Sequence, residues 1–198
     1  EERDRLKAYL AQKIGRPKGE ITRDIWNRHR ESFKIPSLVF TALDAALRPI
    51  EIERSIMDWM RLDIQELHIP KDDSVKAREN WKVALTTTTT RINREWLKQR
   101  SSLSKYDGRD EIWLNRQANP YDSKNLNDRL NRLLQATDIA TSDRDLSWYS
   151  MRHSTGTYVT EEAGLGQASD QLRHKSIETT KRYDHATTEA RGSTLEEL

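Results

Sequence analysis

The chain has 198 residues, which is enough for one large domain or two small ones. It carries 34 basic and 32 acidic residues, so the net charge of +2 does not by itself indicate a nucleic-acid partner. Because it has no cysteine, disulfides, a thiol nucleophile and a cysteine-based zinc site are excluded. No apolar run approaches the roughly 20 residues of a membrane-spanning helix and no secretory signal is visible, so we expect a cytoplasmic protein without a membrane partner.

Helix-forming residues dominate the composition, which favours a mainly helical fold. Apolar residues at helical spacing predict helices over residues 4–14, 21–31, 36–48 and 50–60. The third helix is apolar on much of its circumference, so we expect it to be buried. It should end at Arg48, because the residue before a proline is disfavoured in helical conformation.

The pattern changes after residue 63. Apolar residues over 64–69 suggest a short strand that stops at Pro70, and alternation over 81–85 predicts a second strand. The connection between them is polar and charged. These segments predict a small antiparallel sheet with an exposed turn.

The remainder of the chain is again mainly helical. Five threonines at 86–90 are interpreted as a strand end followed by a helix cap. Helices are expected over residues 88–99, 122–136, 148–162, 166–173 and 176–185, with a short strand-like segment at 111–114.

The segment from Trp148 to Asp184 concentrates reactive side chains. It places Arg152, His174 and Tyr183 beside basic neighbours. A phenol is a poor nucleophile at neutral pH, because its pKa is about 10. Surrounding cations make it a better one, especially toward an anionic phosphate. The hypothesis from these residues alone is that Tyr183 attacks DNA.

Four separated segments occur in the order known from one family. Residues 151–157 read Met-Arg-His-Ser-Thr-Gly-Thr, and residues 172–183 read Leu-Arg-His-Lys-Ser-Ile-Glu-Thr-Thr-Lys-Arg-Tyr. Upstream, residues 45–52 read Ala-Ala-Leu-Arg-Pro-Ile-Glu-Ile, and Lys76 precedes Val83-Ala84-Leu85 by seven residues. These segments resemble the catalytic domain of tyrosine recombinases, the phage integrase family. The resemblance covers roughly residues 33–186 and implies a mainly α fold with a small antiparallel β-sheet, in the α+β class.

One position departs from the commoner pattern. The second box of the family is usually His-x-x-Arg, whereas here it reads Tyr149-Ser150-Met151-Arg152. This variant resembles archaeal integrases of plasmids and proviruses. Tyr149 can donate a hydrogen bond to a phosphate oxygen, but a phenol is a weak base at neutral pH. The alternative is a core tyrosine beside Trp148.

The resemblance implies roles for the remaining residues. Arg48 and Arg152 would clamp the non-bridging phosphate oxygens with bidentate hydrogen bonds. Tyr183 would form a 3′-phosphotyrosyl intermediate without metal, ATP or another cofactor. His174 would bond a phosphate oxygen or help Tyr183 lose its proton.

The leaving 5′ oxygen needs a proton, and a lysine on a turn suits this task. Lys76 is the predicted general acid, with Lys71 and Lys82 as alternatives. Four further basic residues are read either as DNA-phosphate ligands or as a solvated face, the former being favoured: Arg173, Lys175, Lys181 and Arg182. His153, next to Arg152, is read equally as a DNA-phosphate ligand or as a structural residue. No role is assigned to His29, His68 or His185.

The domain organisation follows from the same resemblance. Residues 1–32 are expected to lead into the catalytic domain of residues 33–186, and residues 187–198 to form a tail exchanged between neighbouring subunits. The implied partner is double-stranded DNA at a specific attachment site in the nucleoid. The protein is expected to be a monomer when free and a homo-tetramer when bound to this DNA. The implied function is site-specific recombination. The alternatives are a DNA-binding module without catalysis and a topoisomerase-like relaxer.

Overall fold

The structure is a computed structural model that describes residues 2–13, 33–71, 80–137, 139, 141 and 144–184. Its α-helices are α1 (Glu2–Lys13), α3 (Lys34–Ala45), α4 (Pro49–Arg54), α5 (Thr87–Ser101), α6 (Ser123–Ala136) and α7 (Trp148–Leu172). Its 3-10 helices are η1 (Met57–Trp59), η2 (Ser104–Tyr106), η3 (Ile177–Thr179) and η4 (Lys181–Tyr183). The strands are β1 (Met60–Arg61), β2 (Glu66–Ile69) and β3 (Trp81–Ala84). The helix predicted at 21–31, Lys76, His29, His185 and the tail at 187–198 lie outside the described residues.

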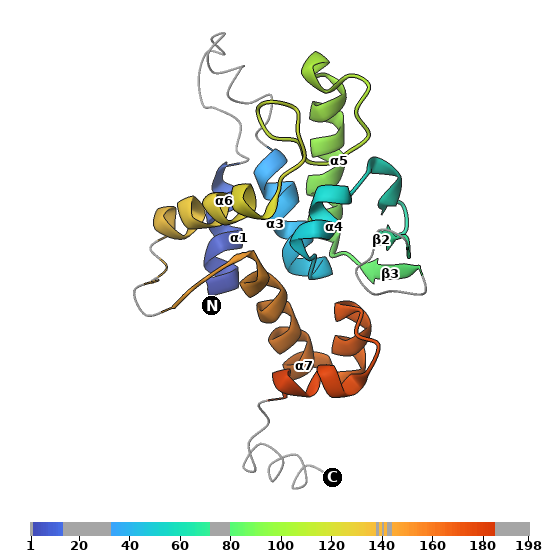
Figure 1. Cartoon of the computed structure of the whole chain (residues 1–198), viewed down its shortest axis with the longest axis vertical. Helices are drawn as coiled ribbons and strands as arrows, with labels where there is room; N and C mark the ends of the chain where they lie inside the picture. The colour runs from blue at the N-terminus through green and yellow to red at the C-terminus, as the bar shows by residue number, and fades with distance from the viewer. Residues whose placement is uncertain are drawn as a thin grey trace, which may run out of the picture.

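Helix α3 lies at the centre of the molecule, between α1, α5 and α7 (Figure 1). All of its residues except Ile35 are buried, as its apolar circumference predicts. The helix ends at Ala45, three residues before the predicted end, because Ala46 adopts the left-handed conformation (φ 49°). Pro49 then occupies the first turn of α4, so this proline begins a helix instead of ending one. As a result, Arg48 caps α4 at the edge of the core.

The three strands form an antiparallel sheet in the order β1-β2-β3. Met60 pairs with Leu67, and Ile69 pairs with Trp81. The predicted antiparallel sheet is confirmed, but β1 replaces the end of the helix predicted at 50–60. Helix α4 stops at Arg54, after which the chain is extended at Ser55 and Ile56.

The threonine run at 86–90 begins α5, as predicted. The side chain of Thr86 accepts a hydrogen bond from the backbone N–H of Thr89 at 3.2 Å and so caps the helix. Both threonine hydroxyls also donate to the buried carboxylate of Asp44 on α3. Lys7 of α1 lies 3.1 Å from the same carboxylate. One buried aspartate therefore joins α1, α3 and the start of α5.

Two predicted elements in the second half differ from the structure. The segment at 111–114 is buried at residues 112–114, but it makes isolated bridges (Ile56 with Glu111, Leu114 with Pro120) instead of a strand. The helix predicted at 176–185 is replaced by the short η3 and η4. Helix α7, by contrast, consists of two helical segments joined across a kink at Gly164 (φ 84°), which agrees with the two helices predicted at 148–162 and 166–173.

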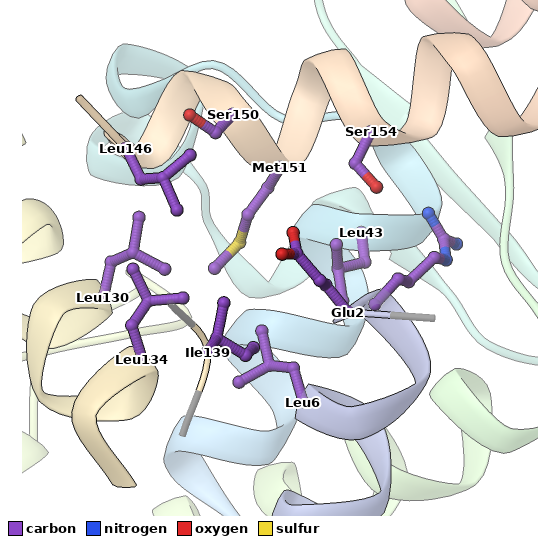
Figure 2. Close-up of a pocket in the computed structure, with 11 residues that line it drawn as sticks. Glu2, Leu6, Leu43, Leu130, Leu134, Ile139, Leu146, Ser150, Met151 and Ser154 are labelled. Atoms are coloured by element: carbon purple, nitrogen blue, oxygen red, sulfur yellow. The ribbon is translucent and has the colours of Figure 1, made fainter. Parts of the chain in front are cut away.

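A small cavity of about 80 Å³ lies where α1, α3, α6 and α7 meet (Figure 2). Met151 extends into it from α7, facing Leu130 and Leu134 of α6. Glu2 lies at its edge and forms an ion pair with Arg144. The cavity is mainly apolar and has no cluster of acid–base groups, so it is not the candidate active site. Among the described helices, none is long and apolar enough to cross a membrane.

Candidate active site

A larger cleft of about 600 Å³ lies where α4, β3, α7 and the C-terminal 3-10 helices meet. Most of its lining side chains are basic or aromatic, and no carboxylate is among the described residues that line it: Arg48, Trp81, Tyr149, Arg152, His153, Arg173, His174, Lys175, Thr179 and Arg182. Figure 1 shows α7 leading from the core to η3 and η4, which return beside it. The cleft is therefore a site for an anion.

Arg48 is held at the edge of this cleft by Glu51, one helical turn later. The Arg48 backbone N–H donates to Glu51 Oε2 and the guanidinium donates to Oε1, both at 2.8 Å. The side chain of Arg48 remains 17 % exposed, whereas that of Glu51 is fully buried. The carboxylate thus orients a guanidinium that still reaches the cleft.

Arg152 is anchored by the ends of two helices. Its guanidinium donates to the carbonyl of Ala46 at 2.7 Å, after the last turn of α3, and to the carbonyl of Leu172 at the end of α7. Such terminal carbonyls have no partner within their helix and favour a cation. Burial and the nearby charges of Arg173 and Arg48 lower the pKa of Arg152 to about 9, so it stays protonated at neutral pH.

Arg173 is the one predicted phosphate ligand whose side chain has no exposed surface. It forms an ion pair with Glu51 at 2.7 Å and donates to the carbonyls of Ala45 and Ala46. Burial favours the neutral form of Glu51, but the charges of Arg173 and Arg48 outweigh it and lower the Glu51 pKa. Although Arg173 lines the cleft, its guanidinium is directed to these partners, which holds α3, α4 and α7 together.

Tyr183 is 3 % exposed and packs with Ala46 and Leu172 in a cluster separate from the main core. Its ring lies against Gly156 of α7, where an added Cβ would come within 2.8 Å of the ring carbon Cζ. Its hydroxyl lies 2.9 Å from Nδ1 of His153. The tyrosine is therefore docked behind the cleft, with its hydroxyl bonded to a residue that lines it.

His174 contacts the ring of Tyr183 and not its hydroxyl. The two rings are stacked with centroids 6.2 Å apart and an interplanar angle of 11°. Nδ1 of His174 lies 2.8 Å from the hydroxyl of Thr180. Burial and the charges of Arg152 and Arg182 lower the pKa of His174 to about 4, so it is neutral at pH 7. Of its two predicted roles, this geometry favours the contact with a phosphate oxygen.

Tyr149 is 46 % exposed and lines the cleft one turn before His153 on α7. The alternative reading as a core tyrosine is wrong; the core position is that of Trp148, which is fully buried. The exposed phenol is free to meet a ligand in the cleft.

The remaining basic residues are distributed unevenly. Lys175 and Arg182 line the cleft, and the Arg182 guanidinium lies 4.9 Å from the centre of the Tyr183 ring. Lys181 is exposed and pairs with Glu178 at 2.7 Å. Lys71 and Lys82 are exposed and neither lines the cleft, although β3 contributes Trp81 to it.

Some residues of the site were not predicted. Glu51 pairs with the arginines, and Gly156 leaves room for the ring of Tyr183. Thr180 bonds His174 through its hydroxyl. Glu51 stands three residues after Arg48, a spacing that puts both residues on one helical turn. This spacing could have predicted their ion pair. The roles of Gly156 and Thr180 depend on contacts that no local pattern indicates.

The mainly helical fold and the basic, anion-binding cleft fit the catalytic domains of one known family. A family model described as the phage integrase family matches residues 24–190, and the chain belongs to this family. It is 29 % identical over 143 residues to the tyrosine recombinase XerC of Treponema denticola, a match covering 65 % of this chain and 46 % of the relative. The chain thus spans about half the length of this relative.

Solved structures of the same class have the same fold. The crystal structure of XerA recombinase aligns with a TM-score of 0.74 and 15 % identity, over 99 % of this chain and 62 % of that one. The crystal structure of XerH bound to its difH substrate in a pre-cleavage complex aligns with a TM-score of 0.73 and 15 % identity, over 98 % of this chain and 51 % of that one. The crystal structure of a lambda integrase dimer bound to a core site aligns with a TM-score of 0.59 and 12 % identity, over 96 % of this chain and 58 % of that one. The predicted mainly helical fold with a small antiparallel sheet is confirmed.

Proposed function

We propose that this domain cleaves and rejoins double-stranded DNA at a specific attachment site, through a 3′-phosphotyrosyl intermediate on Tyr183. The observation that carries the proposal is the cleft itself. Arg48, Arg152 and His174 surround one anion-binding space, and the hydroxyl of Tyr183 lies 2.9 Å from His153, which lines the same space. A phosphodiester would be clamped by the two guanidiniums, whose charge stabilises the pentavalent transition state.

The reaction needs no energy input, because the phosphotyrosyl bond retains the energy of the phosphodiester that it replaces. No metal and no ATP enter the proposal. Lys76 is the proposed acid for the leaving 5′ oxygen. In the sequence it precedes β3, whose first residue, Trp81, lines the cleft. Lys175 and Arg182 in the cleft, and Lys181 beside it, are proposed to contact flanking phosphates.

The assembly is also part of the proposal. Residues 33–186 would act as the catalytic domain, after a leading segment at 1–32. The protein would be a monomer when free and would form a homo-tetramer on DNA, in the cytoplasmic nucleoid. Residues 187–198 would be exchanged between neighbours. The Tyr149-x-x-Arg152 box supports a place among archaeal plasmid or provirus integrases.

The test is capture of the covalent intermediate. The protein is incubated with a pool of nicked suicide duplexes of randomised sequence, and protein-bound DNA is separated under denaturing conditions and sequenced. We expect an adduct that enriches one sequence and that is lost in Tyr183→Phe. An adduct that persists in Tyr183→Phe would rule out this nucleophile, and absence of any adduct in the wild type would favour a DNA-binding module.

The arginine clamp gives a second measurement in the same assay. Arg48→Ala and Arg152→Ala should each slow adduct formation by about 100- to 1,000-fold, the usual cost of one lost transition-state donor. Lys71→Ala is the matched control and should leave the rate unchanged. Relaxation of supercoiled plasmid without strand exchange between two captured sites would favour the relaxer instead.

A further inference from the structure

The hydroxyl of Tyr183 has a defined partner in the structure. Nδ1 of His153 lies 2.9 Å from Tyr183 Oη, and the two rings are 5.7 Å apart at an interplanar angle of 47°. An approach at this distance, with the rings tilted, suits an O–H donor aimed at a ring nitrogen. The contact joins residues 30 apart in the chain, so it depends on how the C-terminal turns dock on α7.

Other groups of the site are less suited to take this proton. His174 stacks on the ring, and its Nδ1 is directed to the hydroxyl of Thr180. Tyr149 is a phenol and therefore a weak base at neutral pH. The carboxylate of Glu51 is enclosed by its ion pairs with Arg48 and Arg173.

His153 has the protonation state and exposure that a proton acceptor requires. Burial and the charges of Arg182 and Arg152 lower its pKa, so the imidazole is neutral at pH 7. In the tautomer whose Nδ1 accepts, the ring hydrogen is on Nε2. That N–H can donate to a DNA phosphate, as His153 is predicted to do. The side chain is exposed to the cleft, so an acquired proton can pass to solvent.

The backbone that carries His153 is firmly held. Its neighbour Arg152 is bonded to the carbonyls of Ala46 and Leu172. Two residues further on, the hydroxyl of Thr155 donates to the carbonyl of Leu43 at 2.6 Å. Helix α7 is thus fixed against α3 on both sides of His153, which satisfies the need for a rigid base near the nucleophile.

We propose that His153 is a catalytic residue that accepts the proton of Tyr183 as the phenol oxygen attacks phosphorus. The O–H bond of Tyr183 breaks and its proton moves to Nδ1 of His153. The oxygen–phosphorus bond forms while the bond from phosphorus to the 5′ oxygen breaks, and that oxygen takes a proton from the general acid. During rejoining, His153 returns the proton to Tyr183. This inference rests on the proposed function of Tyr183 as nucleophile.

The test compares His153→Asn with the wild type in the suicide-duplex assay, using the duplex enriched from the random pool. The amide oxygen of asparagine can accept the hydrogen bond from Tyr183 but cannot take its proton. We expect the rate of adduct formation at pH 7 to fall by about 100-fold or more, within the usual range for a lost acid–base group. His68→Asn is the matched control, because His68 pairs with Glu66 on β2 and does not line the cleft.

The pH profile separates a proton acceptor from a structural residue. The charged or titratable groups that face His153 are Arg152 on α7 and Arg182 and Tyr183 on η4. In the wild type, the rate should fall on acidification as the imidazole becomes protonated. In His153→Asn, the log of the rate should rise steadily with pH, because hydroxide must then remove the phenol proton. A profile parallel to that of the wild type would overturn the proposal.

Two chemical substitutions identify the step. A 5′-bridging phosphorothiolate duplex has a leaving group that needs no proton, so it should not rescue His153→Asn. A fluorotyrosine at position 183, whose hydroxyl is more acidic, should rescue it in part. Rescue by the phosphorothiolate would overturn the proposal, as would a wild-type adduct rate in His153→Asn; neither result would affect Tyr183 as nucleophile. Absence of any wild-type adduct would instead remove the proposed function.

Discussion

The two halves of the cleft are held in different ways. On one side, Arg152 and Arg173 donate to the terminal carbonyls of α3 and α7, and Arg173 also forms a fully buried ion pair with Glu51. On the other side, Tyr183 is the last residue of η4, the second of two short 3-10 helices, and packs in a cluster with Ala46 and Leu172.

This difference separates the task of binding charge from that of delivering the nucleophile. The arginine half is built into the core, so its positive charges are in place before an anion arrives. The tyrosine half is held by the packing of the Tyr183 ring against α7 and by contacts with His153 and His174. Substitutions should therefore affect global stability when they alter the arginine half, and the docking of one side chain when they alter the tyrosine half.

The largest loss of stability is expected from Arg173→Met. It leaves the carboxylate of Glu51 buried without its main counter-charge, and loss of one partner of a buried pair typically costs about 3–5 kcal/mol. Urea unfolding measures this loss. Adding Glu51→Gln to Arg173→Met should restore part of it, since the orphaned charge is then removed. Additive losses in the double variant would contradict the assigned ion pair.

A smaller effect should follow from Gly156→Ala. The new Cβ would lie 2.8 Å from Cζ of Tyr183, so the ring must move and its hydroxyl must leave His153. Overpacking of this kind costs about 1–3 kcal/mol. Gly166→Ala is the control, because nothing lies within 4 Å of a Cβ there. Nitration of Tyr183 by tetranitromethane, followed by mass spectrometry, should increase in Gly156→Ala alone.

His174 should make the tyrosine half sensitive to acid. Its pKa in the folded protein is about 4, below the ordinary value of 6.5. Between these two values the unfolded chain binds a proton that the folded protein does not, so stability should fall as pH decreases from 6.5 to 4. His174→Gln should reduce this slope in urea unfolding measured across the range. An unchanged slope would show that His174 is not the group responsible.

The smallest effect is expected at the end of α3. Ala46 is held at φ 49°, which costs a non-glycine residue about 1–2 kcal/mol. Glycine avoids this cost but loses more chain entropy on folding, by roughly 0.5–1 kcal/mol. Ala46→Gly also removes a buried methyl group that packs with Leu172 and Tyr183, at a cost of about 0.8 kcal/mol, so the net change in stability should stay below about 1 kcal/mol. A larger shift of the denaturation midpoint, without a change in m-value, would contradict this.

Local patterns predicted the fold well where a helix or strand is decided by its own residues. Helix α3, the sheet and the cap at Thr86 follow from apolar spacing and from the chemistry of threonine. The short β1 and the 3-10 turns around Tyr183 were missed. Strand pairing and docking on α7 override the local preference in both places, so the segment itself carries no sign of the outcome.

For the site, the sequence by itself determined the chemistry that is present: two separated arginine boxes, a histidine and a tyrosine in basic company, with no cysteine. Only the tertiary structure decided which groups meet. In the structure Arg173 is buried against Glu51, 122 residues away. The hydroxyl of Tyr183 bonds His153, whereas His174 stacks on the Tyr183 ring. The physical reason is that burial and hydrogen bonding depend on contacts between distant segments, and spacing along the chain does not specify them.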